Sequence, residues 1–171
     1  MKKTISLLTI VFVLCLSLYA CGGVDKQDYK DMVSKCNTDI ADAGIILSNI
    51  GNYEYNYWEA SNNIGGNIDY AHMLDSAKKW LHEKGNIEFI VVENAYTNIC
   101  AQYKEIIKIN VSGADVDEIN DNFNKLFNAY NGMYLLITSP TGDISSFAEN
   151  FNTYSDDFKS SNSILSLLVA E

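Results

Sequence analysis

The chain of 171 residues contains no arginine and only one proline. Nucleic acids and polyphosphates are bound mainly by clustered cations, and arginine matches the geometry of a phosphate best. The chain has 12 lysines against 22 acidic residues, a net charge of −10, so we expect no nucleic-acid partner. The scarcity of proline removes the commonest interruption of helices and favours long ones.

The chain also has few of the residues on which catalytic and metal sites are built. Its only histidines are His72 and His82, and on a helix that spacing separates them by about 15 Å. His82-Glu83-Lys84 lacks the second histidine of a zinc-protease helix. No serine lies in a nucleophile turn, and no glycine-rich loop precedes a helix. We therefore expect no enzymatic activity, no cofactor and no metal.

The acidic residues are interpreted as solvated surface. Three glutamates, Glu54, Glu88 and Glu93, lie beside apolar stripes, where a partly solvated flank is the simplest interpretation. A carboxylate cation site is the alternative for Asp115, Asp117, Glu118 and Asp121, but these residues lack the ordered loop of calcium motifs.

The first twenty residues combine two lysines with an apolar run and end at a small residue before a cysteine. Leu18, Ala20 and Cys21 resemble the lipobox of bacterial lipoprotein signal peptides. The resemblance implies that residues 1–20 are removed, that Cys21 carries a diacylglyceryl group, and that 21–25 form a short linker. The apolar run is short for a transmembrane helix, and a cleaved secretory peptide without lipid is the alternative.

Anchoring through Cys21 implies a position at the cell membrane, facing the outside of the cytoplasm, with the lipid bilayer as one partner. Pro140-Thr141-Gly142-Asp143-Ile144 resembles small helical lipoproteins of Gram-positive bacteria. That resemblance implies compartment and architecture but no activity.

The rest of the chain, residues 26–171, is predicted to be all-α. Apolar residues recur at three- and four-residue spacing over 29–64, 70–106, 116–137 and 144–168, which is the pattern of helices that bury one face. Glycine, asparagine and serine occupy the short connections, so neighbouring helices should run antiparallel. We expect an antiparallel up-down four-helix bundle with two long N-terminal helices and two shorter C-terminal helices.

The unequal helix lengths make a further prediction. The shorter helices cover only about residues 87–109 and 26–50 at 1.5 Å per residue. The remainder, 51–86, must project as a tip or fold back. Both long helices can bend at Gly51 and Gly85, and Lys84-Gly85-Asn86 has the character of a helix C-terminus.

Two cysteines remain beyond the lipidation residue and the signal segment. Cys36 and Cys100 lie at similar distances from the first predicted turn and fall on apolar stripes. An exported compartment permits a disulfide between them, whereas two buried free thiols acting as small core residues are the alternative.

Aromatic residues concentrate in the predicted tip. Tyrosine and tryptophan are enriched where proteins bind partners, because they bury a large area at low entropic cost. The alternative is that they fill space at the end of the bundle. The candidate interaction residues are Tyr53, Tyr55, Tyr57, Trp58, Tyr70 and Trp80.

These observations predict a non-enzymatic, membrane-anchored binding module whose distal tip contacts an unknown protein or small ligand. Two other classes stay open. A small-molecule sensor or solute-binding domain would need a buried polar pocket lined by Tyr96, Tyr103 and Tyr130. A metal-dependent enzyme would need carboxylates and a histidine within ligand distance of one another.

Overall fold

The computed structural model describes residues 24–63, 70–140 and 142–170, and these residues form five helices and no strand. The prediction of an all-α chain is confirmed. The helices are α2 (Lys26–Asn63), α3 (Tyr70–Gly85), α4 (Phe89–Ile106), α5 (Ala114–Thr138) and α6 (Ile144–Leu168).

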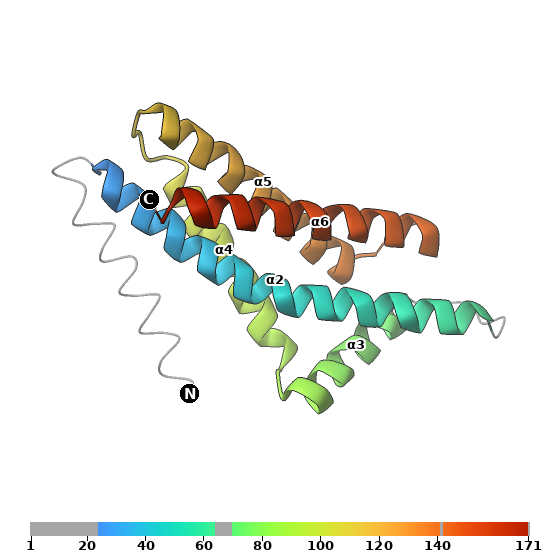
Figure 1. The fold of residues 1–171 in the computed structure, drawn as a ribbon. Coiled ribbons are helices and arrows are strands. Elements are labelled where there is room, and N and C mark those ends of the chain that lie inside the picture. The colour runs from blue at the N-terminus through green and yellow to red at the C-terminus, as the bar shows by residue number, and fades with distance from the viewer. Residues whose placement is uncertain (1–23, 64–69, 141, 171) are drawn as a thin grey trace.

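The predicted second helix is divided into α3 and α4, and the break falls where the sequence placed it. Helix α3 ends at Gly85, and Asn86 has a φ of 49°, in the left-handed region that asparagine tolerates. A polar contact spans the break, with His82 Nδ1 2.8 Å from Glu88 Oε1. Figure 1 shows α3 and α4 meeting at a corner that points away from the other helices.

Helix α2 is the centre of the fold and packs against each of the other four described helices. It lies along the length of the molecule in Figure 1, with α4 and α5 beside its N-terminal part, α6 beside most of its length and α3 beneath its C-terminal part. Apolar residues at three- and four-residue intervals bury one face of α2. The most deeply buried of them are Tyr29, Val33, Cys36, Ile40, Leu47 and Ile50.

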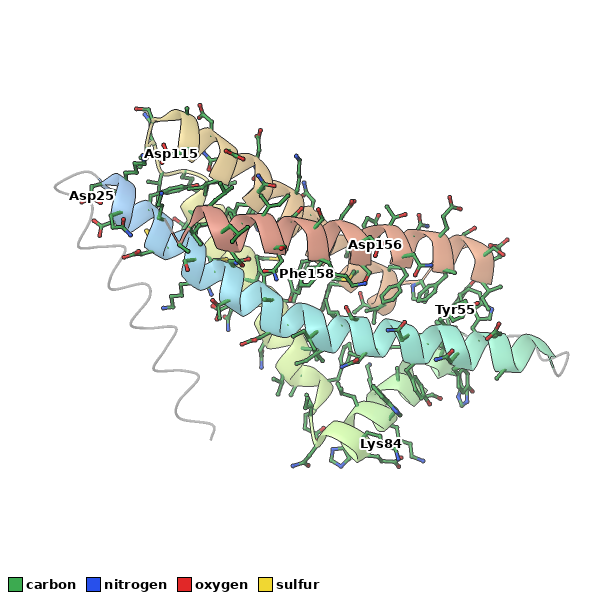
Figure 2. The ribbon with its side chains drawn as sticks, in the orientation of Figure 1. Asp25, Tyr55, Lys84, Asp115, Asp156 and Phe158 are labelled. Atoms are coloured by element: carbon green, nitrogen blue, oxygen red, sulfur yellow. The ribbon has the colours of Figure 1, made fainter. Side chains whose placement is uncertain are left out.

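Two glycines let α6 approach α2 closely. A Cβ atom at Gly44 would overlap the ring of Phe158, and one at Gly51 would overlap the ring of Phe151. Both pairs are seven residues apart on their helices, so the same contact recurs after two turns. Figure 2 shows Phe158 between the two helices.

Helix α2 continues through Gly51 without ending, and the bend expected there stays a prediction. The space that Gly51 leaves is occupied by the ring of Phe151. The predicted limit of the fourth helix was wrong. The Phe147 ring of α6 lies 5.8 Å from the ring of Trp58, so α6 covers α2 well beyond residue 50.

Helices α4 and α5 are joined by two equivalent aromatic stacks. The ring of Tyr96 lies parallel to that of Tyr134 at 3.6 Å. The ring of Tyr103 lies parallel to that of Phe127 at 3.7 Å. Each residue of the second stack is seven positions from its counterpart in the first, and the numbers run in opposite directions. The two helices are therefore antiparallel and in one defined register.

Substitution of Gly44 by alanine tests the close approach of α2 and α6. The new methyl group must displace the buried ring of Phe158, and such overpacking costs about 1–3 kcal/mol. Alanine gains up to about 1 kcal/mol in helix propensity, so we expect Gly44→Ala to lower the free energy of unfolding by about 1–2 kcal/mol in urea titrations. Asn52→Ala, at an exposed position of the same helix, should have little effect. If Gly44→Ala and Asn52→Ala are equally stable, the proposed close contact is wrong.

Candidate functional site

The predicted signal segment 1–20 and the lipidation residue Cys21 lie outside the described residues, so both stay predictions. Among the helices formed by residues 24–63, 70–140 and 142–170, none is long and apolar enough to cross a membrane.

Cys36 and Cys100 are both free thiols in the structure, the first buried and the second half-buried. Burial is the main cause that raises the pKa of Cys36, and the charges of Asp39 and Cys100 raise it further. The influence of Cys100 places the two thiols near one level of the α2–α4 contact. About one turn farther along, Gln102 Nε2 of α4 donates a hydrogen bond of 2.9 Å to Asp39 Oδ2 of α2 and links the two helices. The disulfide between these residues stays a prediction.

Two of the six aromatic candidates are part of the packing of the bundle. Trp58 is only 5% exposed, and its ring meets that of Tyr70 edge-on at 5.1 Å. The Tyr70 hydroxyl donates a hydrogen bond to the carbonyl of Gly142, in the connection before α6. These contacts join α2, α3 and the start of α6, so this part of residues 51–86 folds back onto the bundle.

A second group of aromatic residues is half-exposed and lies along α2 and α3. The Tyr53 ring stacks between Trp80, at 5.0 Å, and Tyr57, at 6.3 Å. The Tyr57 ring contacts that of the exposed His72 at 6.1 Å. We call these four residues the aromatic surface. It is a continuous row of rings with partly accessible faces.

The sixth candidate, Tyr55, is separate from this surface. It is half-buried, and a two-residue step on a helix turns a side chain through about 200°. Tyr55 therefore lies on a different side of α2 from Tyr53 and Tyr57, as its label in Figure 2 indicates, on the side of α6.

Glu54 is the residue whose environment the sequence interpretation missed. It is 0% exposed, and neither carboxylate oxygen has a hydrogen-bond partner among the described residues. Burial raises the pKa of Glu54 to about 8, because an apolar environment disfavours the charged form. The expected solvated flank was wrong for this glutamate, whereas Glu88 is exposed and Glu93 half-buried.

The position of Glu54 on its helix explains this burial. Residues three and four apart share a face of a helix, so Glu54 shares one with Gly51 and Trp58. Gly51 meets Phe151 and Trp58 meets Phe147, and the two phenylalanine rings stack at 6.0 Å. The carboxyl group therefore lies at an aromatic part of the α2–α6 contact.

The tyrosines proposed for a sensor pocket do not form one in the described part of the chain. The Tyr96 hydroxyl donates to Asn131 Oδ1 at 2.6 Å, and the Tyr103 hydroxyl donates to Asn124 Oδ1 at 2.7 Å. Tyr130 is fully buried, and its hydroxyl has no partner there. Two of these three hydroxyls are thus used to join α4 to α5.

Among the residues that the structure describes, no three histidine, cysteine or acidic side chains are placed to hold an ion. Asp115, from the acidic group considered above, forms ion pairs with Lys26 and with Lys30, the latter at 3.7 Å. The hydrogen bond from Lys26 is the main cause that lowers the pKa of Asp115.

Comparison of the chain with protein-family models, with curated proteins and with solved structures finds no significant match. The functional argument therefore depends on the residues of this chain alone.

The raised pKa of Glu54 makes stability depend on pH. Between its ordinary value of 4.5 and the folded value of about 8, the carboxyl is protonated in the folded chain and ionised in the unfolded chain. Folding then takes up a proton, so the stability that Glu54 contributes is greatest below pH 4.5 and is lost as pH rises to 8. We expect wild type to lose about 3–4 kcal/mol relative to Glu54→Gln between pH 5 and pH 8.5.

Urea titrations at several pH values measure this difference. Glu59→Gln is the matched control, since Glu59 is an exposed glutamate on the same helix, and it should follow the wild-type pH dependence. Parallel curves for wild type and Glu54→Gln would contradict the prediction.

Proposed function

We propose that the chain is a membrane-anchored extracytoplasmic lipoprotein that acts as a non-enzymatic binding module through its aromatic surface. The observation that carries the proposal is the row of half-exposed rings formed by Tyr53, Tyr57, His72 and Trp80. Tyrosine and tryptophan contribute most of the affinity of many interfaces. Rings already stacked on one another lose little conformational freedom on binding, which favours a rigid recognition surface.

The proposed architecture is the up-down four-helix bundle expected from the sequence, with α2, α4, α5 and α6 as its members. In this description α3 is an added segment that returns along α2. The 38 residues of α2 extend about 57 Å at 1.5 Å per residue. A lipid on Cys21 would hold the start of α2 near the membrane, and the aromatic surface would then lie about 40–45 Å farther out.

With this arrangement we expect the aromatic surface to bind its partner at a distance from the bilayer. The chain carries ten more acidic than basic residues, and an acidic body is repelled by an anionic membrane. The proposed partner is therefore a protein or a small ligand and not the lipid surface itself.

Cys21→Ser tests the anchor. The two acyl chains of a lipoprotein together hold it stably in a membrane, whereas a chain without them is released. We expect wild type in the membrane fraction and the Cys21→Ser protein mainly outside it. Equal recovery of both proteins in the membrane fraction would contradict lipidation at Cys21.

The aromatic surface is tested by crosslinking on intact cells. The variant Tyr57→Ala/Trp80→Ala removes both ends of the Tyr53 stack while leaving the buried Trp58 in place. We expect at least a tenfold loss of crosslinked partner, because truncation of an aromatic hot spot costs about 2 kcal/mol or more. Tyr55→Ala, a half-buried tyrosine outside the aromatic surface, is the matched control and should retain the partner.

Circular dichroism should show that both variants are folded. Equal recovery of partners by wild type and by Tyr57→Ala/Trp80→Ala would show that the aromatic surface is not the binding site.

A further inference from the structure

The contact between the C-terminal part of α2 and α6 contains an acid where the rest of the contact is apolar. Glu54 lies between the levels of Gly51, which meets Phe151, and Trp58, which meets Phe147. Both carboxylate oxygens are buried without a hydrogen-bond partner in the described residues. A neutral carboxyl is tolerated in such a place at modest cost, whereas an ionised one without a partner is strongly disfavoured.

No charged group compensates for this burial. On α2 the neighbouring titratable residues are Tyr53, Tyr55, Tyr57 and Glu59, and none of them contributes to the pKa shift, whose only cause is burial. No titratable residue of the other described helices contributes either, including His72 and Tyr70 on α3, Glu93 on α4, Tyr134 on α5, and Asp143 and Glu149 at the start of α6. Among the described residues the ionised carboxyl therefore has no counter-charge in the closed structure.

The pair formed by α5 and α6, which faces Glu54, is tightly packed. Helices α5 and α6 share the most extensive contact in the fold. A Cβ atom at Gly132 of α5 would lie 2.6 Å from Cε1 of Tyr154 on α6, so the two helices interlock. Relief of a charge at Glu54 is therefore expected to separate α2 from the α5–α6 pair rather than to divide that pair.

We propose that Glu54 is a proton-operated latch: the protonated carboxyl keeps residues 47–58 of α2 packed on α6, and ionisation releases this contact. Release exposes the rings of Trp58, Phe147 and Phe151 beside the aromatic surface. As a means of regulating partner binding the latch rests on the proposed function, but the opening itself is measured without a partner. The two proposals can therefore fail separately.

The direction of the effect follows from the proton balance. Opening a neutral Glu54 to water releases one proton, because the exposed carboxyl has its ordinary pKa of 4.5 and the buried one a pKa of about 8. The equilibrium constant for opening then rises about tenfold per pH unit between these two values and is constant outside them. The latch is held at acidic pH and loosened at mildly alkaline pH.

Thiol labelling measures the opening. Ser155 is a buried serine of α6 that shares the face of Phe151 and Phe158, and Ser155→Cys places a near-isosteric thiol there. The background replaces the native cysteines (Cys15→Ala, Cys21→Ala, Cys36→Ala and Cys100→Ala). The labelling rate with 4,4′-dithiodipyridine, divided by the rate of the same unfolded chain at each pH, gives the fraction open. We expect this fraction to rise about 50-fold from pH 6 to pH 8.

Two controls make the result specific. In the Glu54→Gln background the fraction open at Ser155→Cys should change less than threefold from pH 6 to pH 8. If the Glu54→Gln protein does not fold, Glu54→Leu replaces it as the control. Val33→Cys, at a fully buried position in the N-terminal part of α2, should be labelled at least tenfold more slowly than Ser155→Cys at pH 8.

Three outcomes would overturn the latch. The first is a fraction open that does not change with pH in the wild-type background. The second is the same change in the Glu54→Gln or Glu54→Leu background. The third is equal labelling at Ser155→Cys and Val33→Cys at every pH, because the bundle would then open only by unfolding as a whole.

Discussion

One 38-residue helix must be covered along its whole length by helices of 16 to 25 residues, and the remaining structure depends on how this is done. Over its N-terminal part α2 is surrounded by α4, α5 and α6, with α6 brought close by Gly44 and Gly51. Farther along, α4 gives way to α3 at the corner near Gly85. The aromatic residues between 53 and 80 fill the space that the change of helix creates.

The helices and the corner were predictable from the sequence because they depend on local signals. The repeated apolar spacing identified the helical segments, and Gly85-Asn86 had the composition of a helix end. Gly51 shows the limit of such signals. The sequence does not reveal that a ring from another helix needs the space at this glycine, because that depends on the position of Phe151.

The candidate site was predicted in part. The sequence identified the aromatic residues but not their division into the buried Trp58 with the half-buried Tyr70 packed on it and the row around Tyr53. It also placed Glu54 at a solvated flank, because charged side chains are rarely buried without partners. Burial of this carboxyl depends on α6 reaching past residue 50, and that extent is a tertiary property that periodicity along α2 does not contain.

The seven-residue repeat of the stacks between α4 and α5 has a consequence for how this fold can change in length. Tyr96 with Tyr134 and Tyr103 with Phe127 are copies of one contact, and each carries a tyrosine-to-asparagine hydrogen bond at the same offset. Removing or adding one repeat on both helices preserves the register. Any other change in length places the aromatic rings of one helix opposite the backbone of the other. Evolution of this bundle toward shorter or longer forms should therefore proceed in steps of two helical turns.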